Sequence, residues 1–198
     1  MDPMCSWCFA FAEPLRQLQT QTNLSIEWIM GGLAPDNDEP MSEEMKATIA
    51  GYWQKISALT GVQFNHDFWS NNIPRRSSYP ACRAVIAAEK MMPGSSQQMA
   101  GSIQQAYFEQ AQSPSDTEVL ISCAEKIGLN AERFGHELHG EAVEMILQQH
   151  LNLVQQWGIQ GFPALLLTQH RKAAPLTLGY CSTAELTAHY QDALRLFQ

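Results

Sequence analysis

Asp2-Pro3-Met4-Cys5-Ser6-Trp7-Cys8-Phe9, at the start of the chain, places two cysteines behind a proline and ahead of an apolar run. This pattern is typical of a dithiol at the start of a helix. Residues three apart share one helix face, so Cys5 and Cys8 can close a small disulfide ring. The unpaired N–H groups and the dipole at the helix start favour a thiolate, so we expect a lowered pKa at Cys5. Cys8, one turn deeper, is expected to keep a more ordinary pKa and to resolve a mixed disulfide.

Half of a zinc site is the main alternative for this pair. Such a site needs two further Cys or His ligands at similarly close spacing. The remaining cysteines stand alone, and the two closely spaced histidines have no cysteine cluster to match; these residues are Cys82, Cys123, Cys181, His136 and His139. We therefore expect no metal site. A purely structural disulfide is disfavoured too, because so small a ring constrains the unfolded chain little.

The composition is that of a globular protein with room for one generous domain or a domain carrying an insertion. The chain has 198 residues, 45% of them hydrophobic, and a formal net charge of −8. Its basic residues form no block longer than a pair such as Arg75-Arg76, which argues against nucleic acid or an anionic membrane as a partner. No apolar run is long enough to cross a bilayer and no secretory signal pattern precedes the dithiol, so we expect a cytoplasmic protein. In that reducing compartment a C-x-x-C pair is more often catalytic than structural.

Hydrophobic spacing predicts a short α/β unit interrupted by a long helical stretch. Leu24–Met30 is expected to form a strand, and two later strands ending at Leu167 and Leu178 are expected to pair as a hairpin. Ser115 is expected to cap one helix through a capping box, and Ser182 or Thr183 to cap the last helix. Helices are predicted over 9–19, 42–59, 79–92, 95–112, 115–128, 130–138, 141–157 and from 182 or 183 to 197.

This order predicts that the α/β unit is built from two separate parts of the chain. Residues 1–34 and 158–198 would form the unit, and residues 35–157 an all-helical insertion between them. The insertion would lie over the dithiol as a lid and add apolar surface for holding a peptide or a small thiol.

Two further motifs accompany the dithiol. They are Tyr79-Pro80-Ala81-Cys82-Arg83-Ala84 and Gly158-Ile159-Gln160-Gly161-Phe162-Pro163-Ala164-Leu165. Together with Asp2 to Cys8 they resemble the DsbA-like thioredoxin-fold oxidoreductases of the FrnE type, over essentially the whole chain. The resemblance implies a thioredoxin-like fold with a large helical insertion. It also implies thiol-disulfide oxidoreductase or isomerase activity without a bound cofactor.

The resemblance assigns roles to three residues. It makes Cys5 the nucleophile, Cys8 the resolving cysteine and Pro163 a cis-proline that faces the dithiol. The backbone of Phe162 would then pair in β fashion with an extended thiol substrate beside Cys5.

Ser6 and Trp7 lie between the two cysteines. Residues at these positions tune the stability of the thiolate and hence the redox poise. Trp7 would either offer an aromatic contact to the substrate or simply cover Cys8. We include both residues in the candidate substrate-binding site.

One feature departs from the pattern of this fold. A thioredoxin unit begins with an interior strand immediately before the dithiol helix, whereas only Met1 to Met4 precede Cys5 in this chain. We therefore expect that strand either to lie upstream of Met1 or to be supplied by another segment, for instance by exchange in a homodimer.

Two other functions stay open beside the oxidoreductase. The layout is similar to glutathione-dependent enzymes of the kappa-class transferase or 2-hydroxychromene-2-carboxylate isomerase type, although these usually place a serine at the position of Cys5. A non-catalytic peptide-binding module would use the helical insertion and leave the dithiol idle. The expected partners are disulfide- or thiol-containing peptides or small molecules, glutathione among them.

Overall fold

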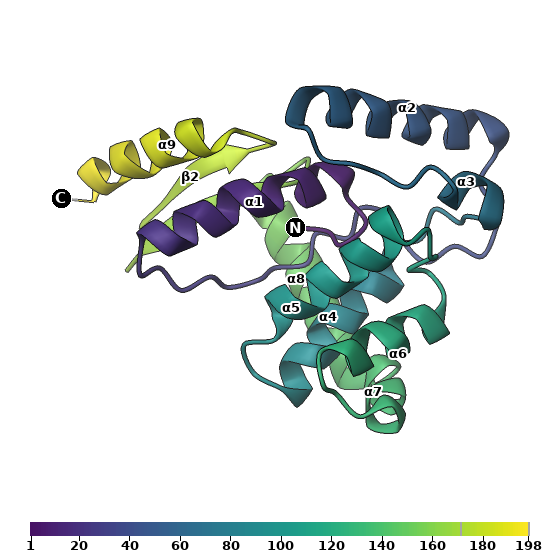
Figure 1. The fold of residues 1–198 in the computed structure, drawn as a ribbon. Helices are drawn as coiled ribbons and strands as arrows, with labels where there is room; N and C mark the ends of the chain where they lie inside the picture. Colours follow the sequence, from purple (N-terminus) through teal and green to yellow (C-terminus); the bar gives the residue numbers. More distant parts are fainter. Residues whose placement is uncertain (171, 198) are drawn as a thin grey trace.

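The computed structural model describes residues 1–170 and 172–197. Figure 1 shows α1, α9 and the hairpin gathered at one end, α2 and α3 beside them, and the remaining helices below. In chain order the elements are α1 Ser6–Gln21, α2 Glu43–Thr60, α3 Phe68–Asn71, α4 Tyr79–Met91, α5 Ser96–Gln104, the π-helix η1 Gln105–Glu109, α6 Thr117–Lys126, α7 Ala131–Leu138, α8 Glu141–Gln156, β1 Ala164–Gln169, β2 Lys172–Leu178 and α9 Thr183–Leu196.

α1 is the element that joins the dithiol to the hairpin. It begins directly after Cys5, and its apolar residues Phe11, Leu15 and Leu18 recur at helical spacing and are all buried. They form one cluster with Leu176 of β2 and Leu186 of α9. Because burying each such side chain contributes about 1.5–3 kcal/mol, this stripe fixes α1 against the C-terminal part of the chain.

β1 and β2 form the predicted antiparallel hairpin. Ala164 pairs with Leu178, and the register shifts between Leu165 and Leu166, so β2 bends there. The predicted cap of the last helix is also present. The Ser182 hydroxyl accepts from the Glu185 N–H, and the Glu185 carboxylate accepts from the Ser182 N–H, which together make a capping box.

Leu24–Met30 is not a strand, so that prediction is wrong. Its side chains from Leu24 to Trp28 alternate between half-buried and exposed, as they would in a strand. Among the described residues, however, only Met1 pairs with it in ladder fashion: the Met1 nitrogen donates to the Ile29 carbonyl (2.8 Å), and the Gly31 N–H donates to the Met1 carbonyl (2.7 Å). A strand needs a hydrogen-bonded neighbour along its length, and one residue does not supply it.

α4 lies at the centre of the helical part and contacts α5, α6, α7 and α8. Its buried face consists largely of small side chains, which let the neighbouring helices approach closely; they are Ala81, Cys82, Ala84, Ala87 and Ala88. The predicted helix over 95–112 is present as α5 but ends in the π-helix η1. Ser115 does not cap α6, because Asp116 is the N-cap residue and the Ser115 hydroxyl donates to the Ser77 carbonyl (2.8 Å).

An aromatic cluster joins α2 and α3 to the start of α1. Trp53 of α2 is 1% exposed, and its ring lies 5.1 Å from that of Phe64 and 5.5 Å from that of Phe108. Phe9 of α1 stacks on Phe108 at 4.9 Å. Aromatic pairs at these distances add about 0.5–1.5 kcal/mol each beyond their burial, so the cluster holds α2 over the dithiol end of α1.

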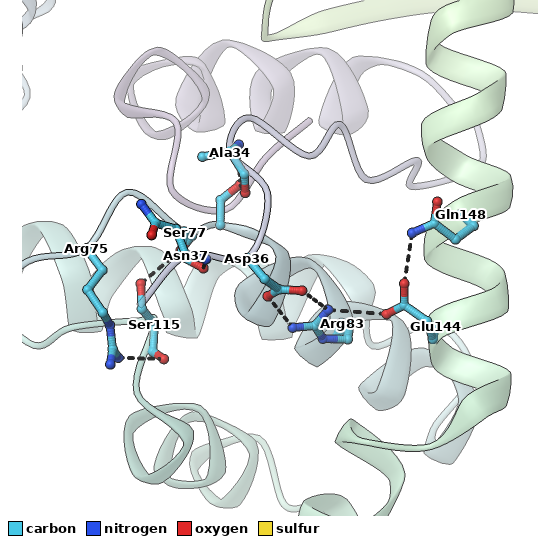
Figure 2. A network of polar contacts seen from close by, with 10 residues as sticks. Ala34, Asp36, Asn37, Arg75, Ser77, Arg83, Ser115, Glu144 and Gln148 are labelled. Atoms are coloured by element: carbon cyan, nitrogen blue, oxygen red, sulfur yellow. Dashed lines mark hydrogen bonds and ion pairs between the residues drawn. The ribbon is translucent and has the colours of Figure 1, made fainter. Parts of the chain in front are cut away.

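Two backbone segments lead into and out of α2 and α3, and they pair with each other. The Met41 N–H donates to the Pro74 carbonyl (2.8 Å), and the Ser78 N–H donates to the Ala34 carbonyl (2.9 Å). Figure 2 shows Ser77 with Asn37 and Ser115: the Asn37 N–H on the entering segment donates to the Ser77 hydroxyl (3.3 Å), and the Ser115 hydroxyl before α6 donates to the Ser77 carbonyl (2.8 Å). These two paired segments, which we call the paired stem, therefore anchor α2 and α3 together with the aromatic cluster.

Arg83 of α4 ties the entering segment to α8. Its guanidinium contacts Asp36 on that segment and Glu144 on α8, with the Glu144 contact at 3.2 Å (Figure 2). This side chain belongs to the Tyr79 to Ala84 motif. Arg83 therefore gives this motif a structural role, because it links the entering segment to α8.

These observations confirm an α/β fold that is mostly helical and carries a small two-stranded sheet. The division into 1–34, 35–157 and 158–198 stays a prediction. No helix in the described ranges has both the length and the apolarity that crossing a bilayer requires.

Replacing Trp53 with alanine is expected to lower the free energy of unfolding by about 3–5 kcal/mol, because it opens a cavity inside the aromatic cluster. Urea denaturation followed by circular dichroism measures the change. Tyr52→Ala is the matched control: this neighbour on α2 is 53% exposed, so the loss is expected to stay within about 0.5 kcal/mol. Equal losses in the two variants would contradict the aromatic anchoring of α2.

Candidate active site

Cys5 is the N-cap residue of α1 and has an extended backbone (φ −81°, ψ 115°). Its N–H donates to the Asp2 carbonyl (3.1 Å), and its own carbonyl accepts from the Phe9 N–H (3.1 Å). Cys8 follows within the first turn, on the same face. Both thiols are buried, with Cys5 7% and Cys8 5% exposed. The predicted dithiol is therefore in place at a helix N-terminus, with little exposure to solvent.

The surroundings of Cys5 lower the pKa of its thiol. The main cause is the Cys8 thiol, which lies beside Cys5 Sγ as a hydrogen-bond donor, and burial opposes it. The backbone N–H groups of Cys8 and Trp7 also favour the thiolate, although neither reaches strict hydrogen-bond geometry to the sulfur. These are the unpaired amides of the first helical turn, as the position of the dithiol predicts.

The surroundings of Cys8 act in the opposite direction. Burial raises its pKa well above the usual range, and the neighbouring Cys5 adds to that effect. As the pH rises, the Cys5 thiol therefore ionises before the Cys8 thiol. This asymmetry is what nucleophilic attack followed by resolution requires.

Phe162 and Pro163 meet the dithiol from the other end of the chain. The Cys5 thiol lies 3.5 Å from the Phe162 carbonyl oxygen, a contact between residues 157 positions apart. The Phe162–Pro163 peptide bond is cis, and the buried Pro163 accepts at its carbonyl from the Gly179 N–H (2.7 Å). Once Cys5 is a thiolate it no longer donates, and the Phe162 carbonyl is free for another donor.

Gly31 makes room for this arrangement. A Cβ atom on Gly31 would overlap the ring of Phe162, and a Cβ on Gly32 would overlap Tyr79 and Leu151. The Gly31-Gly32 pair thus lets Phe162 and the helical part pack directly on the backbone beside the dithiol. Sequence reasoning did not place these glycines in the site, because their requirement depends on Phe162, Tyr79 and Leu151, which lie far along the chain.

Ser6 and Trp7 are half-buried on the first turn of α1. The Trp7 ring lies 5.6 Å from that of Tyr180 and packs against the aromatic cluster. Trp7 lies between the two cysteines in the sequence and also contacts the C-terminal part of the chain through Tyr180. The contribution of Ser6 and Trp7 to substrate binding stays a prediction, and Tyr180 is a neighbour that sequence reasoning missed.

Within the described part of the chain, no group of three or more His, Cys, Asp or Glu side chains is placed to hold a metal ion. The remaining cysteines, Cys82, Cys123 and Cys181, are all buried thiols, and burial is the main cause that raises the pKa of each. A thiol with a raised pKa stays protonated at neutral pH and is a poor nucleophile. Cys5 therefore differs from these three cysteines in its readiness to react.

A family model described as thioredoxin matches residues 1–184. The chain belongs to the thioredoxin family. This membership confirms the expected thioredoxin-like fold, which in this chain carries its dithiol at the start of α1 and a helical part between α1 and the hairpin.

Solved structures similar to this thioredoxin-family chain include proteins of disulfide chemistry. A candidate protein disulfide isomerase from Nitrosomonas europaea superimposes with a TM-score of 0.90 at 25% identity, covering 100% of this chain and 96% of that one. The cytosolic disulfide reductase DsbM from Pseudomonas aeruginosa, in a structure with GSH, gives 0.78 at 25% identity, covering 98% and 96%. A 2-hydroxychromene-2-carboxylate isomerase is similar in fold alone, with a TM-score of 0.64 at 18% identity.

Curated relatives carry a different name. The ClpXP adapter protein SpxH of Halalkalibacterium halodurans is 24% identical over 172 residues, covering 84% of this chain and 56% of its own length. SpxH of Bacillus subtilis is 24% identical over 174 residues, covering 86% and 58%. This thioredoxin-family chain thus spans somewhat more than half the length of these relatives.

Replacing Gly31 with alanine is expected to lower the free energy of unfolding by about 1–3 kcal/mol and to slow alkylation of Cys5, because the new methyl group displaces the Phe162 ring. Urea denaturation and the alkylation rate measure the two effects. Gly51→Ala is the matched control, since nothing lies within 4 Å of a Cβ there. The Gly51→Ala protein is expected to be more stable by about 0.5–1 kcal/mol, with an unchanged alkylation rate at Cys5. An unchanged Gly31→Ala protein would contradict the packing described.

Replacing Cys8 with alanine is expected to raise the pKa of Cys5, because it removes the thiol donor that is the main cause of the lowering. The pH dependence of Cys5 alkylation, followed by mass spectrometry, measures this pKa. Cys8→Ser keeps a hydroxyl donor at the same place and is expected to retain more of the lowering. A Cys8→Ala protein that alkylates at the same pH as the parent would show that Cys8 does not activate Cys5.

Proposed function

We propose that this chain is a thiol-disulfide oxidoreductase that acts as a reductase or isomerase, with Cys5 as the nucleophile and Cys8 as the resolving cysteine. The observation that carries the proposal is the pair of adjacent buried thiols at the start of α1, whose surroundings lower the pKa of Cys5 and raise that of Cys8. The disulfide isomerase and reductase among the similar structures support it.

The proposed reaction transfers two electrons to a substrate disulfide. The Cys5 thiolate attacks one substrate sulfur, a Cys5–substrate disulfide forms, and the other substrate sulfur leaves as a thiolate that takes up a proton. Cys8 then gives up its proton and attacks Cys5 Sγ, the mixed disulfide breaks, and the second substrate sulfur leaves as a thiol. The substrate has gained two electrons and two protons, and Cys5–Cys8 has become a disulfide. Two equivalents of a small thiol such as glutathione restore the dithiol.

The site favours an extended or small substrate. Cys5 is only 7% exposed, so a rigid protein surface has little access to its sulfur. The Phe162 carbonyl, 3.5 Å from that sulfur, can accept a backbone N–H of an extended peptide once Cys5 is ionised. Disulfides in flexible peptides and small-molecule disulfides therefore fit best.

Two further observations support a cellular location and a subgroup for this chain. The cytosolic reductase structure with GSH supports a cytoplasmic location and a glutathione-linked cycle for this chain. The dithiol motif, the Tyr79 to Ala84 motif and the Gly158 to Leu165 motif support the FrnE type among DsbA-like proteins. The kappa-class alternative is less favoured, because a second cysteine, Cys8, is held in place to resolve a mixed disulfide.

An adapter function is the second candidate, because the curated relatives are named ClpXP adapter proteins. In that function the helical part would bind a protein partner, and the dithiol would be dispensable. The two candidates differ in whether Cys5 is needed.

Reduction of a fluorescent peptide disulfide in the presence of glutathione and glutathione reductase tests the proposal. Cys5→Ser is expected to abolish turnover, at least about a hundredfold below the parent, because it removes the nucleophile. Cys8→Ser is expected to accumulate a mixed disulfide on Cys5 that mass spectrometry detects. Cys181→Ser is the control, because the buried Cys181 thiol packs in the hydrophobic cluster formed by α1, β2 and α9. We expect this variant to keep full turnover.

Two results would overturn the oxidoreductase proposal. One is no turnover by the parent protein together with an ordinary pKa at Cys5, which would favour the adapter function. The other is turnover that survives Cys5→Ser.

A further inference from the structure

We propose that Asp2 is a positioning residue of the dithiol, whose buried carboxylate holds the segment before Cys5 in place and makes the reduced pair a stronger reductant. This inference rests on the proposed function. Asp2 belongs to the opening motif, but neither its residue type nor its spacing assigns it a role.

Asp2 is fully buried, at 0% exposure, and its carboxylate accepts hydrogen bonds from several directions. Oδ1 accepts from the Met4 N–H (2.8 Å). Oδ2 accepts from the Leu33 N–H (2.6 Å), the Ser78 hydroxyl (2.7 Å) and, at 3.6 Å, the Cys82 thiol. These donors come from the dithiol segment, the turn after Gly31-Gly32 and α4, so one side chain joins three parts of the chain.

The donors around Asp2 match an ionised carboxylate, which only accepts hydrogen bonds. The Ser78 oxygen accepts from the Ala34 N–H (3.0 Å), and its hydroxyl lies closer to Asp2 Oδ2 (2.7 Å) than to its other acceptor, the Ala34 carbonyl oxygen (3.3 Å). Among the described residues no lysine or arginine forms an ion pair with this carboxylate. The protein thus keeps a negative charge in its interior, three residues before Cys5.

The backbone of Asp2 touches the dithiol itself. Its carbonyl accepts from the Cys5 N–H (3.1 Å), and its N–H faces the sulfur of Cys8. The charge of its side chain is a smaller cause that opposes the net lowering of the Cys5 pKa, and it adds to burial in raising the pKa of Cys82 and of Tyr107. Asp2 therefore places both cysteines and at the same time opposes a thiolate on Cys5.

Opposing the thiolate changes the redox equilibrium. The disulfide form of the pair carries no charge, whereas the reduced form can ionise at Cys5. A dithiol is a strong oxidant when its reduced form is stabilised, as DsbA illustrates. A fixed anion beside the pair destabilises the reduced form and so favours giving electrons to a substrate. This matches the direction of the proposed reaction.

Asp2→Asn tests the role of the charge, because asparagine has nearly the same shape without the charge. The dithiol–disulfide equilibrium is measured in glutathione redox buffers, and the pKa of Cys5 by alkylation. We expect the equilibrium to shift about tenfold toward the reduced form, equal to about 30 mV, together with a lower pKa for Cys5.

Two controls separate charge from stability. Ser78→Ala removes one hydrogen bond to Asp2 but keeps its charge. Glu89→Gln neutralises another carboxylate, which accepts from the Gly94 N–H (2.7 Å) and the Ser96 N–H (2.9 Å) on the helical part. Both are expected to unfold at lower urea concentration while leaving the equilibrium constant within about threefold of the parent value. An unchanged equilibrium in Asp2→Asn, or an equal shift in the two controls, would overturn the inference.

A second variant covers the case in which Asp2→Asn does not fold. Asp2→Glu keeps the charge with a longer side chain, and we expect an equilibrium constant within about threefold of the parent. A shift of about tenfold in Asp2→Glu would show that geometry and not charge sets the equilibrium. Neither readout requires substrate turnover. Failure of the proposed function would appear instead as a parent protein that does not reduce the peptide disulfide.

Discussion

The contact between Cys5 Sγ and the Phe162 carbonyl is the constraint on which the rest of the site depends. It joins residues 157 positions apart, and the chain between them forms the whole helical part. α1 must therefore be fixed against the hairpin and α9, which its buried stripe of Phe11, Leu15 and Leu18 achieves. The glycine at position 31 then allows the Phe162 ring to lie on the backbone, so the carbonyl reaches the thiol.

The helical part serves this contact in two ways. α2 and α3 cover the start of α1 through aromatic packing, which limits the exposure of the dithiol and strengthens the electrostatic interactions around it. α4 supplies Ser78 at its N-cap and Cys82 within its first turns, and both hydrogen bond to the Asp2 carboxylate. The Cys8 thiol donor and, to a smaller extent, the free amides of the first helical turn lower the pKa of Cys5, whereas burial raises the pKa of Cys8.

Sequence reasoning succeeded where local chemistry decides the structure. The dithiol helix, the hairpin and the last helix follow from spacing and composition, and the family membership confirms the thioredoxin-like fold that the three motifs imply. Two similar capping patterns show the limit. Ser182 forms the predicted capping box with Glu185, whereas the hydroxyl of Ser115 is taken by the Ser77 carbonyl on the paired stem. The hydrogen bond from Ser115 to this distant carbonyl contributes about as much stability as a helix cap would, so the tertiary contact decided the role of Ser115.

The sequence by itself determined the chemistry of the pair: two cysteines at the start of a helix, with the activating amides nearest the first, because that depends only on neighbours within one turn. Only the tertiary structure decided which distant groups complete the site. The Phe162 carbonyl, the room above Gly31 and the donors around Asp2 come from segments whose approach depends on packing over the whole chain. For the same reason Leu24–Met30 has the alternation of a strand without being one, since a strand also requires a neighbour that no local pattern supplies.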